Sequence, residues 1–161
     1  MAFYYRLSAD HTLSVQQLRY ALHLIVNKHQ SLRTSLIFDN KKNILTQRIV
    51  DQENLKENLF SITESIYETA EQLDSIVRYE QTNYQHFELS QGLVFRCHLV
   101  YHKQISSNGV LSDKDVLIFN FHHALFDSPS MNIFLRALNQ AYTKGELSID
   151  DNNLLRYLDC K

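Results

Sequence analysis

The chain has 161 residues, the size of one domain, and a chain of this length can bury about 68–70% of its unfolded surface. Three glycines and one proline exclude collagen-like and low-complexity chains. The net charge of −2, without runs of like charge, predicts no nucleic-acid partner. There is no membrane-length apolar run, no signal-peptide pattern and no disulfide framework, so we expect a cytoplasmic domain.

The first third of the chain predicts a strand, a helix and a hairpin in that order. Phe3–Leu7 has the aromatic content of a short strand. Ser14 is a suitable N-cap for a helix that we expect to end near His29. The apolar face of this helix consists of Val15, Leu18, Leu22, Ile25 and Val26. Leu32–Phe38 and Ile44–Val50 predict two strands joined by a polar turn.

The middle of the chain predicts the centre of a sheet. Phe60–Ile66 favours a strand, and apolar residues at helical spacing between Ala70 and Tyr84 favour a helix. In Val94–His102 apolar and polar residues alternate, which predicts one buried face and one wet face. Asp115–Phe121 is apolar on both faces, as is typical of a central strand in a covered sheet.

The last predicted helix begins after this central strand. We expect Ser128 as its N-cap, Pro129 at its first position and Lys144-Gly145 at its end. The order of elements predicts an α/β fold, an α+β sandwich in which helices pack on a mixed sheet.

His122 and His123 stand at the end of the central strand, and Asp127 follows four residues later. Adjacent strand residues point to opposite faces, so we expect no metal site from the two histidines. In one hypothesis, one of the two imidazoles is a packed, hydrogen-bonded core group, and Asp127 is a helix cap or an ion-pair partner. The other makes an imidazole a general base, because its ordinary pKa near 6.5 suits proton transfer.

Two further absences narrow the chemistry. The chain has no Gly-x-Ser-x-Gly elbow and no cysteine placed as a nucleophile, so we expect direct transfer without an acyl-enzyme. It also has no glycine-rich phosphate loop, which argues against nucleotide hydrolysis.

Four segments resemble motifs of nonribosomal peptide synthetase condensation domains, in the family's order. His122–Ser128 resembles the HHxxxDG motif, and Lys28–Leu36 resembles the RHExLRTxF motif. Phe87–Leu93 is similar to the stretch that contains Phe-Asp-Leu and Gly-Pro-Leu. Leu154–Asp159 is similar to the tyrosine-containing segment after the motif helix.

This resemblance implies the chloramphenicol acetyltransferase-like fold, in which two lobes enclose an active-site tunnel. Residues 1–161 resemble the N-terminal lobe alone, and we expect the C-terminal lobe to be absent. The implied partners are that C-terminal lobe and the donor and acceptor carrier domains. Their phosphopantetheine presents the substrates, and no cofactor is expected to bind directly. Without the C-terminal lobe, the apolar face that would pack against it is left exposed, so we expect the chain to self-associate.

The resemblance also implies roles for single residues. His123, the second histidine of the motif, is the expected base in amide-bond formation, and His122 is the first. Asp127 is expected to form a structural ion pair with a basic residue of the RHExLRTxF-like segment, Arg33 or Lys28. Lys28 stands where that motif has its first arginine, and a lysine lacks the bidentate fork of a guanidinium.

Ser128 replaces the motif glycine, so we expect its side chain to crowd the substrate tunnel. Together with Lys28 it leaves a second hypothesis open, that of a degenerate lobe acting as a binding or assembly module. A related epimerization lobe, or a lobe of a coenzyme A-dependent acyltransferase, is a third. We expect the isolated lobe to be inactive, since it forms half a tunnel.

Overall fold

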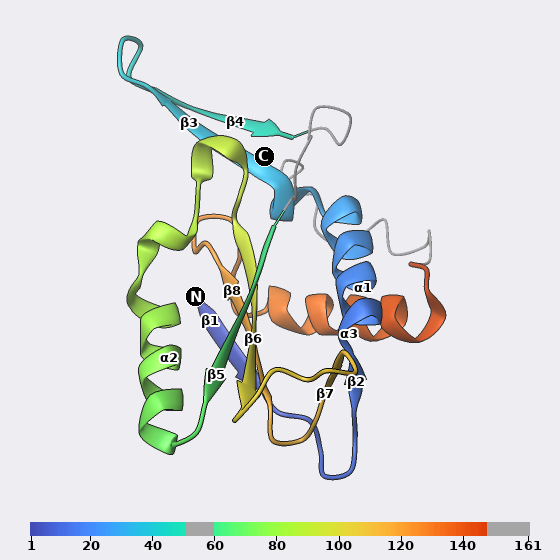
Figure 1. Ribbon diagram of the computed structural model, residues 1–161. Coiled ribbons are helices and arrows are strands. Elements are labelled where there is room, and N and C mark those ends of the chain that lie inside the picture. Colours follow the sequence, from blue (N-terminus) through green and yellow to red (C-terminus); the bar gives the residue numbers. More distant parts are fainter. Residues whose placement is uncertain (51–59, 148–161) are drawn as a thin grey trace.

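The computed structural model describes residues 1–50 and 60–147 (Figure 1). The Leu154–Asp159 segment singled out from the sequence lies outside the described residues. No helix in the described part of the chain is long and apolar enough to cross a membrane.

A mixed four-stranded sheet forms the centre of the molecule, in the order β1-β8-β6-β5. β8 (Val116–Phe121) pairs antiparallel with both β1 (Ala2–Tyr5) and β6 (Phe95–His102). β5 (Ser61–Tyr67) pairs parallel with β6 at the edge. All six residues of β8 are buried, which confirms the prediction of a central strand covered on both faces.

Three helices cover the two faces of this sheet (Figure 1). α1 (Val15–Lys28) and α3 (Ser130–Lys144) pack against each other and share one hydrophobic core with the sheet. α2 (Ala70–Thr82) lies on the opposite face and contributes partly buried residues to a smaller core. The predicted layered α/β architecture is therefore confirmed.

The face of β6 that we expected to be wet is covered, and that prediction was wrong. His98 and Val100 lie on this face and are 6% and 0% exposed. The reason is tertiary: α2 and the residues after it lie over this side of the sheet (Figure 1). Strand alternation predicts which residues share a face, but whether water reaches that face depends on the element that packs over it, which here is α2.

Caps explain most helix ends. The Ser14 side chain accepts a hydrogen bond from the Gln17 amide, and Gly145 ends α3 in the left-handed region at φ 71°. The expected N-cap Ser128 was wrong, because α3 begins at Ser130. The Asp127 carboxylate accepts a hydrogen bond from the Ser130 amide instead, at 3.0 Å.

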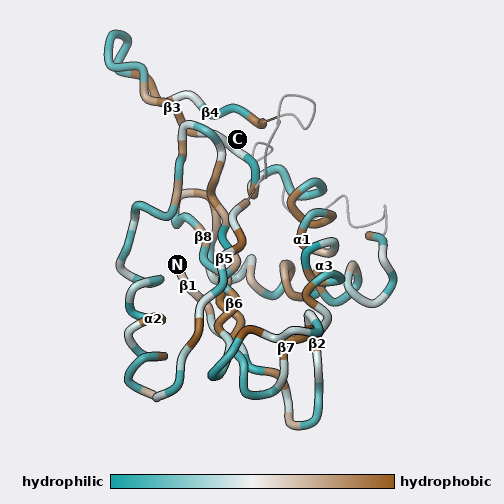
Figure 2. The backbone as a smooth tube through the Cα atoms, in the orientation of Figure 1, coloured by the Kyte–Doolittle hydropathy of each residue, from teal (hydrophilic) through white to brown (hydrophobic). Residues whose placement is uncertain are grey.

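A hairpin of β3 (Thr34–Asp39) and β4 (Ile44–Ile49) extends from the body of the molecule (Figure 1). A 3₁₀ turn, Gln30–Arg33, connects it to α1. Figure 2 shows hydrophobic residues along the central strands and also on this arm. Its exposed large apolar residues are Ile37, Phe38, Ile44 and Leu45.

The remaining short elements complete the connections. β2 (Leu13–Ser14) and β7 (Val110–Leu111) form a small antiparallel pair beside the main sheet. The 3₁₀ turns Tyr84–His86 and Leu89–Gln91 lead from α2 into β6.

Candidate functional site

The turn that follows β8 carries both histidines. The His122 amide donates to the Val94 carbonyl at 2.8 Å, which extends the sheet by one residue beyond Phe121. The Leu125 amide then donates to the His122 carbonyl at 3.1 Å, and the chain turns toward α3. A buried central strand is a rigid support for a reacting group at its end.

The two imidazoles lie in different surroundings. The His122 ring is half-buried and meets the Phe87 ring edge-on, with centroids 5.5 Å apart. Its Nδ1 accepts the Ala124 amide at 3.2 Å, which requires an unprotonated Nδ1. Burial and, next, the positive charge of the N-terminal ammonium lower the pKa of His122. His122 is thus a packed, neutral group that organises the turn.

The His123 side chain is exposed and borders a pocket of about 250 Å³. The pocket brings together the turn after β8, the start of α3 and the segment between α1 and β3. The lining residues are Ser31, His123, Ala124, Leu125, Phe126, Asp127 and Ser130. One imidazole, one carboxylate and two serine hydroxyls therefore converge on an apolar floor, the composition expected of a small-molecule site.

Sequence reasoning missed the two polar lining residues Ser31 and Ser130. A smaller cavity of about 10 Å³ also borders both serines and reaches His29. The one available signal for Ser31 was its place inside the RHExLRTxF-like segment. No periodicity shows that this segment lies against a turn about ninety residues further along the chain.

Asp127 stabilises the start of α3. Its Oδ1 accepts hydrogen bonds from the backbone amide and the hydroxyl of Ser130. These two bonds, the hydroxyl first, lower the pKa of the Asp127 carboxyl, so the group is an anion at neutral pH. The carboxylate thereby holds the pocket-lining Ser130 hydroxyl in place.

The expected ion pair between Asp127 and Arg33 is wrong. The Arg33 guanidinium donates instead to two backbone carbonyls, from Nε to Asn27 at 3.3 Å and from Nη1 to Val50 at 2.8 Å. Arg33 thus joins the end of α1 to the end of the hairpin. Between described residues, no ion pair links Asp127 to Arg33 or to Lys28, the last residue of α1.

Ser128 is not among the pocket-lining residues. Its hydroxyl is directed toward the Met1 sulfur, 3.7 Å away. Its φ is not positive, so the backbone at this position does not require the glycine of the family motif. Within residues 1–50 and 60–147, no three His, Cys, Asp or Glu side chains are arranged to hold a metal ion.

Comparisons with known proteins identify the family of the chain. The family model described as "Condensation domain" matches residues 4–159. The chain is 27% identical over 145 residues to "Hybrid PKS-NRPS synthetase LUC5" of Fusarium sp, covering 90% of this chain and 3% of that protein. It is 28% identical over 134 residues to "Surfactin synthase subunit 2" of Bacillus subtilis, covering 83% of this chain and 3% of that protein.

Solved structures share the fold. The epimerization domain of tyrocidine synthetase B superposes with a TM-score of 0.68 at 19% identity, covering 90% of this chain and 30% of that one. The X-domain from teicoplanin biosynthesis gives 0.63 at 24% identity, covering 98% and 31%. The chain thus spans under a third of these structures and a few per cent of its curated relatives. Because the family match extends over nearly all its residues, the chain belongs to the condensation-domain family.

Proposed function

We propose that residues 1–161 form the N-terminal lobe of a condensation domain that joins thioester-bound acyl or aminoacyl groups to an amine, with His123 as the base. The observation that carries this proposal is the exposed His123 imidazole in a pocket it shares with the Asp127 carboxylate. Cytoplasmic synthesis of a peptide-like metabolite fits the same proposal.

The reaction needs a proton acceptor and a fixed geometry. The amine nitrogen attacks the thioester carbonyl carbon, a C–N bond forms and the C–S bond breaks. His123 takes the proton from the attacking nitrogen and returns it to the departing thiolate, so the base is unchanged at the end. The Asp127 carboxylate lines the same pocket.

The pocket is open, and its proposed partners complete it. A C-terminal lobe would close the pocket into a tunnel, and donor and acceptor carrier domains would deliver their substrates on phosphopantetheine. Holding two reactants in line can supply about 7–11 kcal/mol of a barrier, so the isolated chain should be inactive.

A second candidate is a binding or assembly lobe without chemistry. The missing Asp127–Arg33 ion pair favours it, together with Lys28 and Ser128 at motif positions. The test is amide formation by a two-lobe protein that contains this chain, supplied with loaded donor and acceptor carriers.

In that assay His123→Ala should lower the rate about 10²–10⁴-fold while the melting temperature stays close to that of the parent. His11→Ala is the matched control, because His11 is exposed and bonds only locally, to the Ala9 carbonyl. Equal rates for the parent and His123→Ala would exclude His123 as the base.

A further inference from the structure

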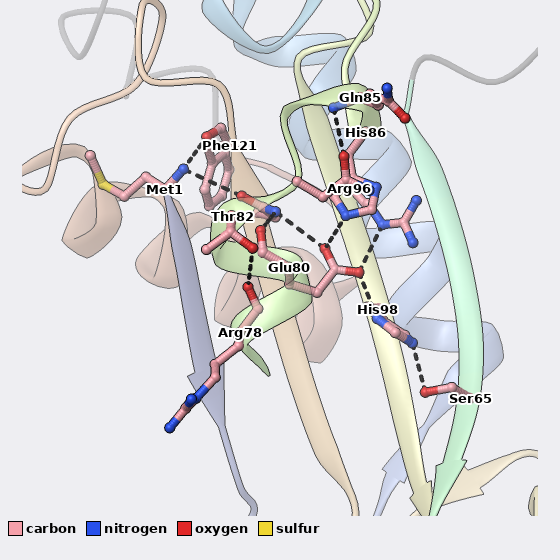
Figure 3. A network of polar contacts seen from close by, with 12 residues as sticks. Met1, Ser65, Arg78, Glu80, Thr82, Gln85, His86, Arg96, His98 and Phe121 are labelled. Carbon is pink, nitrogen blue, oxygen red and sulfur yellow. Dashed lines mark hydrogen bonds and ion pairs between the residues drawn. The ribbon is translucent and has the colours of Figure 1, made fainter. Parts of the chain in front are cut away.

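Glu80 is a fully buried carboxylate at the end of α2, surrounded by polar groups of the sheet (Figure 3). Its Oε1 accepts from Arg96 Nε at 3.1 Å and lies 2.8 Å from His98 Nδ1. Its Oε2 accepts from Asn120 Nδ2 at 3.2 Å. Burial alone would raise the pKa of this carboxyl, but these hydrogen bonds and the Arg96 charge hold it at about 2. Glu80 is therefore ionised.

Two of these contacts lead directly to the turn that carries the histidines. Asn120 lies on β8 two residues before His122, and its Nδ2 also donates to the Glu80 carbonyl at 2.6 Å. Arg96 lies opposite Asn120 on β6. Val94 lies two residues before Arg96, and its carbonyl accepts a hydrogen bond from the His122 amide. Glu80 thus holds both strands at the point where the turn begins.

A third connection reaches the His122 ring itself. His86, on the 3₁₀ turn that follows α2, lies beside Glu80: its Nε2 is 3.7 Å from Oε2, longer than a hydrogen bond, and burial lowers the pKa of this ring. The next residue, Phe87, packs edge-on against the His122 imidazole. Glu80 therefore reaches the backbone at His122 through hydrogen-bonded neighbours, and the His122 ring only through the packing of His86 and Phe87.

Glu80 is the most deeply buried point of contact between α2 and the sheet. Glu80 is the one fully buried residue of α2, and the apolar residues that the helix turns toward the sheet, Leu73, Ile76 and Val77, are only partly buried. A buried ion pair is by itself weak evidence for stability, and an apolar residue of similar size could also hold the helix against the sheet. What the charged cluster adds is directional contacts to three strands: β6, β8 and, through the bond of His98 to Ser65, β5.

We propose that Glu80 is a positioning residue of the condensation site, fixing His122 and thereby the turn that presents His123. This rests on the proposed function, since it treats that turn as the reacting one. Glu80 acts through its hydrogen bonds to Asn120 and Arg96 and does not touch substrate.

The test is a pH titration of histidine ring signals by NMR in the 161-residue chain, comparing the parent with Glu80→Gln. Losing a nearby negative charge would lower the pKa of His122. Loss of positioning admits water to the ring and raises that pKa toward its ordinary value. We expect the upward shift, with broadened His122 signals. Glu64→Gln is the matched control, because Glu64 pairs with Arg19 at the surface.

Glu80→Gln leaves Arg96 buried without its counter-ion, so Glu80→Gln with Arg96→Met is the second variant, in which both charges are removed. If either variant is folded and shows His122 signals and a midpoint like the parent's, or a downward shift, the proposal is overturned. The readout requires no catalysis. A His123→Ala protein that retains activity therefore bears on the proposed function and leaves this measurement unaffected.

Discussion

The stability of the Glu80→Gln variant can be worked out from the buried network. Glu80 is 1% exposed, and the side chain of Arg96 is 15% exposed, so neither ion is well solvated. Breaking a buried pair by removing one partner costs about 3–5 kcal/mol. The depression of the Glu80 pKa from 4.5 to about 2 independently corresponds to about 3 kcal/mol. For a loss of about 3 kcal/mol, on which the two figures agree, we expect the melting temperature to fall by about 6–12 °C.

The same network predicts the direction of the acid dependence. A carboxyl whose folded pKa is depressed stabilises the fold fully above its ordinary pKa and loses that contribution as the pH falls. For Glu80 the window runs from 4.5 down to about 2. The parent should lose the glutamate's contribution across this window, whereas Glu80→Gln should show a flatter dependence.

Thermal melting at pH 7 measures the change in melting temperature. Urea unfolding followed by circular dichroism at pH 7 and pH 3 measures the free energy of unfolding and its dependence on pH. Glu64→Gln is again the control, because the Arg19–Glu64 pair is 44% and 32% exposed and such surface pairs contribute about 0–1 kcal/mol. If the two variants unfold at the same urea concentration at pH 7, the network does not stabilise the fold as argued.

Three other predictions follow from local geometry. Phe126→Ala should lower the free energy of unfolding, measured in urea, by about 3–5 kcal/mol, because the Phe126 ring stacks on Phe121 with ring centroids 3.7 Å apart. A loss below about 1 kcal/mol would contradict this. Asp127→Asn should keep most of the melting temperature that Asp127→Ala loses, since an amide oxygen still accepts from Ser130, and equal melting of the two would refute the capping role. The chain should self-associate in light scattering, and Phe38→Ser with Leu45→Ser should reduce the mass, because these paired residues are over half exposed; a monomeric parent would count against it.

Local patterns in the sequence determined much of the architecture. The two-sided apolar run before the histidines is the central strand β8, since only a strand covered on both faces buries every residue. Ser14 and Gly145 mark helix ends because their capping geometry depends on neighbouring backbone alone. The His122-His123 pair stands where the motif placed it, directly after that strand.

Tertiary packing decided how polar groups are paired. Arg33 bonds to the Asn27 and Val50 carbonyls because the end of α1 and the end of the hairpin lie beside it, whereas Asp127 is satisfied locally by Ser130, three residues along the chain. Ser31 joins the pocket from a distant segment, and Glu80 meets Arg96, His98 and Asn120 once α2 lies on the sheet. A local pattern records which face of an element is apolar. The choice of partner for a charged group depends on which elements pack together, and only the folded chain contains that information.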